Sequence, residues 1–187
     1  EYNMKVKYSD LKNKRIFITG GGSGIGASIV EHFCEQGSEV YFVDIDLKET
    51  KKLLNKIKKN KFRTPTFIEC NLLDINKLEK TIKNIIAKKG PIHALINNAA
   101  NDDRHTTDQV DEKYWENRMA INLKHYFFAA KAVVKSMKKM KAGSIVNLSS
   151  VSWMLGEGDK VVYETAKSAV VGLTRSFAQE YGKYNIR

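Results

Sequence analysis

The N-terminal part of the chain contains the segment Arg15-Ile-Phe-Ile-Thr19, which runs directly into Gly20-Gly-Gly-Ser-Gly-Ile-Gly26. The short apolar run is typical of a buried strand, and the glycines allow the tight turn that follows it. A helical pattern then ends at Gly37 and presents one apolar face, which carries Ile25, Ile29, Val30 and Phe33. The segment therefore predicts a strand, a tight turn and a helix.

The same alternation continues along the chain. Further strands are predicted at residues 40–43, 66–70, 92–96 and 144–148. Helices are predicted at 47–60, from the N-cap Asp74 to Gly90 with Leu78, Ile82 and Ile86 buried, at 112–140 as one long helix, and from about Val161 with Val170, Leu173 and Phe177 facing inward. Alternating strands and helices imply right-handed βαβ units. We therefore predict a doubly wound α/β fold with a parallel sheet.

We expect residues 1–187 to form a single domain, because nothing in the composition marks a second one. The chain ends at Arg187, where the alternation predicts another strand, so we expect this domain to be incomplete at its C-terminus. No apolar run approaches the ~20 residues that span a bilayer, and the first residues do not resemble a secretory signal. The expectation is a soluble, cytoplasmic protein.

The formal net charge is +11, which raises the possibility of nucleic-acid binding. The lysines, however, concentrate in residues 51–61 and 135–141, where apolar residues interrupt them at helical spacing. We interpret them as solvated helix faces and expect no nucleic-acid partner. The two cysteines, Cys34 and Cys70, have neither a CxxC nor a metal-ligand spacing, so reduced thiols and no metal site are expected.

The glycines suit a nucleotide site, because a glycine turn before a helix lets the backbone and the helix N-terminus approach a pyrophosphate. Asp44 ends the second predicted strand, 18 residues after Gly26. A carboxylate there can accept ribose hydroxyls and repels a 2′-phosphate, which favours NAD over NADP. The alternative is that Asp44 caps the next helix, although Asp46 could do so instead. Asn97-Asn-Ala-Ala100 follows the fourth strand, and we expect Asn97 to tie neighbouring strands together.

Tyr163 and Lys167 are four residues apart on one predicted helix and therefore lie on one face. An ordinary phenol, with a pKa of about 10, is a poor base at neutral pH, but a nearby ammonium favours the phenolate. The alternative is simple surface packing. Ser150, 13 residues before the tyrosine, could bond the reacting oxygen, whereas Ser149 should face the other side of its strand. Asn122 is a mediocre helix former within a helix, which indicates a buried amide or a bound water.

These segments together resemble the short-chain dehydrogenases/reductases, a family with a TGxxxGxG turn, an NNAG-type segment and an Asn-Ser-Tyr-Lys tetrad. The resemblance implies that Tyr163 is the general acid/base, Ser150 orients the substrate, Lys167 assists the tyrosine and binds the nicotinamide ribose, and Asn122 holds a water. It implies NAD contacts at Gly20, Ser23, Gly24, Ile25, Gly26, Asp44, Asn71, Leu72, Asn98, Ala99, Tyr163 and Lys167. The chain departs from the family pattern at Asn71, usually aspartate, and at Ala100, usually glycine.

A finer resemblance, carried by residues 97–105, 150–153 and 163–167, is to the aldose 1-dehydrogenases of this family. It implies oxidation of a sugar at C1 to the lactone, with polar and aromatic contacts from Asn101, Asp102, Arg104, His105, Ser150 and Trp153. The alternatives are an Asp103–Arg104 pair that only holds the loop, another alcohol or carbonyl substrate, and a nucleotide-binding protein without catalysis.

Family resemblance also implies a homodimer or homotetramer formed through the helix at 112–140 and the helix after Tyr163. The first of these helices is suited to this because it carries more apolar residues than one sheet face requires, namely Tyr126, Phe127, Phe128, Val133 and Val134.

Overall fold

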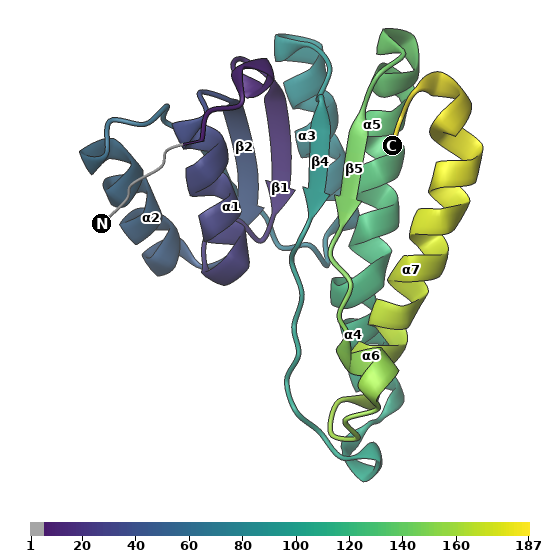
Figure 1. The fold of residues 1–187 in the computed structure, drawn as a ribbon. Helices are drawn as coiled ribbons and strands as arrows, with labels where there is room; N and C mark the ends of the chain where they lie inside the picture. Colours follow the sequence, from purple (N-terminus) through teal and green to yellow (C-terminus); the bar gives the residue numbers. More distant parts are fainter. Residues whose placement is uncertain (1–5) are drawn as a thin grey trace.

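The computed structural model describes residues 6–187, and its centre is a sheet of five parallel strands in the order β3-β2-β1-β4-β5 (Figure 1). The strands are β1 (Arg15–Thr19), β2 (Glu39–Asp44), β3 (Thr66–Glu69), β4 (Ala94–Asn97) and β5 (Ser144–Asn147). The helices are α1 (Gly24–Glu35), α2 (Leu47–Lys59), α3 (Ile75–Lys89), α4 (Glu112–Met119), α5 (His125–Met140), α6 (Ser152–Leu155) and α7 (Val161–Tyr181). The predicted doubly wound α/β fold is confirmed.

The inner strands β1, β2 and β4 alternate their side chains between two separate hydrophobic cores. In β1, Ile16 and Ile18 join the core that contains residues of α1 and α2, whereas Phe17 joins the core that contains residues of α3, α5 and α7. All three side chains are at most 1% exposed. A sheet covered on both faces buries every residue of its central strands, which explains the continuous apolar runs of β1 and β2.

Two residues of the predicted helix faces lie elsewhere than expected. Ile25 is 68% exposed, because the residue that approaches the sheet in the first turn of α1 is Gly26. In α3 the buried stripe is completed by Ile85, and Ile86 is only half-buried. The N-cap of α3 is Asp74, as predicted, and its carboxylate accepts a hydrogen bond from the backbone N–H of Lys77.

The long helix predicted at 112–140 is interrupted. Between α4 and α5 the chain forms one π-helical turn, η3 (Ala120–Lys124), which contains the buried Asn122. π-turns are rare and occur mostly as single insertions in helices. Here the turn directs the Asn122 amide at the backbone of Asn101, with bonds of 2.8 and 2.9 Å, so a local polar contact replaces regular helical geometry.

The apolar surface expected for self-association is smaller than predicted. Tyr126, Val133 and Val134 are at most 5% exposed and pack inside the domain, so they cannot contribute apolar surface to a contact with a second copy. Phe127 is 42% exposed, and its ring lies 5.8 Å from that of Phe177 on α7. The expectation was wrong for the three residues that the domain core already uses.

The end of the chain returns to the sheet. After α7 and a short 3-10 turn, Ile186 forms a parallel bridge with Gly143, and the carbonyl oxygen of Arg187 accepts a bond from the Ile145 N–H. This lies beside β5, where the alternation predicts a strand. Cys34 and Cys70 are buried free thiols, as expected. Within residues 6–187, no helix combines the length and apolarity needed to cross a bilayer.

Gly26→Ala should destabilise the connection between β1 and α1, because a Cβ at this position would lie 1.8 Å from the carbonyl oxygen of Gly20. We expect a loss of roughly 1–3 kcal/mol in the free energy of unfolding, as for other overpacked sites. The matched control is Gly172→Ala in α7, where an added Cβ meets no heavy atom within 4 Å. The control should gain up to roughly 1 kcal/mol through helix propensity. Equal urea midpoints for the two variants would contradict this.

Candidate active site

A cleft of about 530 Å³ opens at the carboxyl ends of the strands. It lies where β1 and β4 are neighbours and the strand order reverses, which is where open α/β sheets bind ligands. A larger hollow of about 800 Å³ between α3 and α5 contains none of the predicted site residues. The cleft is lined by all twelve residues expected to contact NAD, and also by Ile45, Cys70, Ala100, Asn101, Asp102, Ile121, Leu148 and Ser149.

The glycine turn forms the floor of this cleft. Its backbone is fixed by bonds from the Gly20 N–H to the Val43 oxygen (2.8 Å) and from the Asn98 amide to the Gly20 oxygen (2.9 Å). Ser23 precedes α1 without capping it by its side chain, so the N–H groups of the first turn have no cap from this residue. A Cβ at Gly20, Gly22 or Gly26 would collide with its surroundings, so the backbone itself forms the cradle. These features fit a dinucleotide phosphate.

Asp44 lies at the end of β2 and is held by three backbone N–H groups. Its carboxylate accepts bonds from Gly22 (2.8 Å), Ile45 (2.7 Å) and Asp46 (2.9 Å). The cap of α2 is Asp46, which accepts a bond from the Glu49 N–H, so Asp44 is not the residue that caps this helix. The carboxylate of Asp44 is therefore fixed in position where it lines the cleft.

Two residues that the sequence analysis did not identify support the far side of the turn. Thr19 Oγ1 accepts bonds from the N–H groups of Asn98 (3.0 Å) and Ala99 (3.2 Å) and lies 3.4 Å from His125 Nε2. Burial lowers the pKa of His125 to about 3, so its imidazole is neutral and its Nε2 can accept a hydrogen bond from the Thr19 hydroxyl. The signal in the sequence was a threonine at the end of a strand and a histidine in an apolar helix, neither of which is specific.

Asn97 has the structural role that the sequence predicted. Its amide donates to the Asn147 side-chain oxygen (2.9 Å) and to the Tyr126 backbone oxygen (3.2 Å), which joins β4, β5 and α5. The amide of Asn147 in turn donates to Thr174 Oγ1 on α7 (2.9 Å). The helix that carries the tyrosine and lysine is therefore tied to the sheet.

Lys167 is almost fully buried beside Tyr163. Its ammonium donates to the Leu148 oxygen (2.8 Å) and to Tyr126 Oη (2.9 Å), and it lies 5.7 Å from the centre of the Tyr163 ring. Burial lowers the pKa of Lys167 to about 8 and raises the pKa of Tyr126 well above its ordinary value. Tyr126, which the sequence analysis did not single out as a site residue, is therefore a neutral phenol that holds the ammonium in place.

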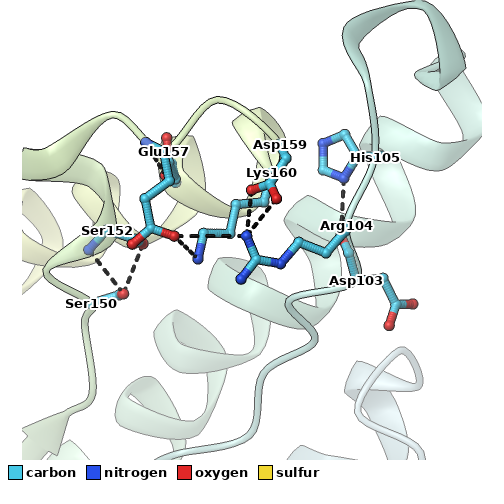
Figure 2. A network of polar contacts seen from close by, with 9 residues as sticks. Asp103, Arg104, His105, Ser150, Ser152, Glu157, Asp159 and Lys160 are labelled. Carbon is cyan, nitrogen blue, oxygen red and sulfur yellow. Dashed lines mark hydrogen bonds and ion pairs between the residues drawn. The ribbon is translucent and has the colours of Figure 1, made fainter.

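The two serines at the end of β5 have different surroundings. Ser149 lines the cleft, and its hydroxyl donates to the Lys167 backbone oxygen (2.7 Å). Ser150 Oγ lies 2.8 Å from Ser152 Oγ and accepts the Ser152 N–H (Figure 2), and Ser150 is not among the cleft-lining residues. Trp153 follows in α6, half-buried and also outside this set.

The loop after β4 divides into a part in the cleft and a part bonded elsewhere. Asn101 and Asp102 line the cleft. Asp103 pairs with Arg118 (2.8 Å), and Arg104 pairs with Asp159, whose pKa is held below its ordinary value by the guanidinium. The Asp103–Arg104 pair considered from the sequence is thus not formed, because each residue has a partner on another segment. The part of the chain that the structure describes holds no cluster of three or more metal-ligand side chains.

The buried ammonium predicts an unusual pH dependence of stability. Between the lowered pKa of about 8 and the ordinary value of 10.5, the unfolded chain binds more protons than the folded chain at Lys167. The contribution of this residue to the free energy of unfolding therefore rises with pH in that window. We expect the free energy of unfolding of the wild type, relative to that of Lys167→Met, to increase by about 3 kcal/mol between these two pH values. Urea unfolding of both proteins at each pH measures this change. A difference independent of pH would contradict the burial effect.

Comparison with known proteins extends these observations. A family model described as "short chain dehydrogenase" matches residues 14–187. The chain is 42% identical over 180 residues to a D-xylose 1-dehydrogenase of Caulobacter vibrioides, covering 96% of this chain and 71% of the relative. It is 39% identical to a protein named "Probable galactose dehydrogenase GalD" of Rhizobium meliloti, covering 97% of this chain and 71% of that protein.

Among solved structures, the ligand-free aldohexose dehydrogenase of Thermoplasma acidophilum superposes with a TM-score of 0.83 at 31% identity, covering 96% of this chain and 66% of that one. The five-stranded parallel sheet with helices on both faces agrees with these matches. The chain belongs to the short-chain dehydrogenase family.

Proposed function

We propose that the protein transfers a hydride from C1 of an aldose to NAD and releases the aldonolactone. The observation that carries this proposal is the cleft, in which Tyr163 and Lys167 stand with the glycine turn, Asp44 and the polar residues Asn101 and Asp102. A hydride acceptor, a proton acceptor and hydrogen-bonding groups for a sugar are the three components that the reaction requires.

NAD, when bound, would supply the hydride acceptor; the glycine turn and the start of α1 would hold its pyrophosphate, and Asp44 would hold its adenosine ribose. Tyr163 takes the proton from the C1 hydroxyl as the C–H bond breaks, and the C1–O bond becomes the lactone carbonyl. The bonds of the Lys167 ammonium to Tyr126 and Leu148 hold it beside the Tyr163 ring, where its positive charge would assist the tyrosine and bind the nicotinamide ribose.

The sugar assignment is supported by the polarity of the substrate end. Asn101 and Asp102 line the cleft, and an apolar ligand that covered the NH2 group of Asn101 and the carboxylate of Asp102 would leave them unpaired at roughly 1–3 kcal/mol each. We assign Ser150 to the reacting oxygen and Trp153 to the C–H face of the sugar. Arg104, held by Asp159, is assigned to the loop and not to the substrate. The relatives named for xylose and galactose agree with a sugar.

Self-association through α5 and α7 remains part of the proposal. Phe127 and the partly buried ring of Phe128 lie edge to face 5.2 Å apart, next to Phe177 of α7. These rings are the apolar surface that a second copy would cover.

The test of the proposal is an assay of D-xylose, D-galactose and L-arabinose with NAD, with 2-propanol as a simple alcohol. We expect aldose-dependent NADH formation that falls by about 10²–10⁴-fold in Tyr163→Phe, while NADH affinity stays within about twofold, since the variant lacks only the proton acceptor. Tyr8→Phe, whose side chain lies on the surface, is the control. Faster oxidation of 2-propanol than of any aldose would contradict the assignment of a sugar substrate. An active Tyr163→Phe variant would contradict the assignment of Tyr163 as the base.

Cofactor preference tests the role of Asp44. We expect NADH to bind at least about tenfold more tightly than NADPH, because the fixed carboxylate would face the 2′-phosphate with like charge. Asp44→Asn should shrink this ratio by about tenfold, which corresponds to about 1.4 kcal/mol. Asp46→Asn is the matched control, since asparagine caps a helix as well as aspartate does. Equal affinities of the wild type for both nucleotides would contradict the assignment.

A further inference from the structure

The helix that carries Tyr163 and Lys167 begins without a cap of its own. The residue before α7 is Lys160, which makes no side-chain capping bond and, as a cation, has no acceptor to offer. The acceptor comes from the loop after β4, where His105 Nε2 receives the backbone N–H of Val162 at 3.3 Å. Val162 immediately precedes Tyr163, so this contact fixes the backbone next to the tyrosine.

The surroundings of His105 determine which nitrogen carries the proton. Because Nε2 accepts a bond from an N–H group, the hydrogen of the neutral ring is on Nδ1. Nδ1 lies 3.0 Å from the Asp103 backbone oxygen and 2.9 Å from Tyr114 Oη, and the Tyr114 ring packs edge-on at 5.0 Å. The side chain is held from both ends, and the residue is only 6% exposed.

The backbone around His105 is fastened to the segment that precedes α7. The His105 N–H donates to the Asp159 backbone oxygen (2.7 Å), and Arg104 pairs with the Asp159 carboxylate. Glu157 lies between Arg104, at 3.8 Å, and Lys160, at 2.5 Å (Figure 2). Four contacts therefore join the loop to the start of the helix, and of these only the bond from the Val162 N–H to His105 Nε2 is both buried and directed at the helix.

We propose that His105 is a positioning residue for Tyr163, acting as the N-terminal cap of α7 from a separate loop; its catalytic consequence rests on the role proposed for the tyrosine. Both ring nitrogens of His105 are bonded within the protein, Nε2 to Val162 and Nδ1 to Asp103 and Tyr114, so the residue acts through the helix and not on the substrate. Loss of the acceptor leaves the Val162 N–H unpaired and loosens the first turn. Lys167, one turn later, stays anchored by Leu148 and Tyr126, so the tyrosine moves relative to the ammonium.

Three substitutions separate the acceptor from the volume of the side chain. In His105→Gln the amide oxygen can take the place of Nε2. In His105→Asn the side chain is too short for its oxygen to reach the Val162 N–H, and in His105→Leu there is no acceptor. We expect amide exchange at Val162 to be at least about tenfold faster in the Leu and Asn variants and within about threefold of wild type in the Gln variant. This measurement needs no substrate, so its outcome is independent of the proposed reaction.

Kinetics with the best aldose then test the positioning itself. We expect kcat to fall at least about tenfold in His105→Leu and His105→Asn with KM and NADH affinity little changed, because misplacement of a reacting group affects mainly the chemical step. In these two variants the acid limb of the pH dependence of kcat should move to higher pH. His105→Gln should have a kcat and an acid limb close to those of the wild type. His32→Leu, on the exposed side of α1, is the control and should match wild type.

Three results would overturn the proposal. One is a Val162 amide that exchanges at the wild-type rate in the Leu and Asn variants. Another is equal loss of kcat in the Gln and Leu variants, which would indicate that the imidazole acts in another way. The third is fast exchange of the Val162 amide in the Leu and Asn variants while kcat and the position of the acid limb stay unchanged. By contrast, an active Tyr163→Phe would remove the proposed base and leave the capping result intact, so the two failures are distinguishable.

Discussion

The interaction on which the rest of this site depends is the reciprocal bonding between the ends of β1 and β4. The Asn98 amide donates to the backbone oxygens of Thr19 (3.1 Å) and Gly20, while Thr19 Oγ1 accepts the N–H groups of Asn98 and Ala99. Beyond the last ladder pair, Thr19 with Asn97, the two chains must turn away in different directions and would leave these groups unpaired. Two short polar side chains satisfy them, and the cleft opens directly above.

The chemical end of the cleft depends on a different constraint, the burial of a cation. An ammonium with little water around it is stable only when its N–H groups find acceptors, and Lys167 finds them in Leu148 and Tyr126. Tyr126 is itself buried and bonded through its hydroxyl to the Leu148 oxygen (3.2 Å). The lowered pKa of Lys167 reflects the free-energy cost of this burial, and the same bonds fix the charge beside the Tyr163 ring.

Much of this could be predicted from the sequence, because the relevant signals are local. The alternation of strands and helices, the glycine turn and the Asp44/Asp46 distinction all depend on residues within about twenty positions of one another. The π-turn at Asn122 could not be predicted, since its cause is a bond to Asn101, a residue of another segment. The partners of Asp103 and Arg104 could not be predicted for the same reason. Arg104 and Asp159 are 55 residues apart, and the sequence suggested the pair of adjacent residues, Asp103 and Arg104, which does not form.

The two halves of the cleft differ in how firmly they are held. The half of the cleft that contains the glycine turn is built from backbone groups and the buried amide of Asn97. The loop beyond Asn101 and Asp102 instead relies on exposed ion pairs such as Arg104–Asp159, which contribute little in water. The helix α7 is therefore anchored by the bonds of the buried Lys167, whereas its first turn meets a loop whose charged contacts are weak. The buried imidazole of His105 at that junction holds the loop and the helix together where exposed charges would not, because its bond to Val162 is shielded from solvent.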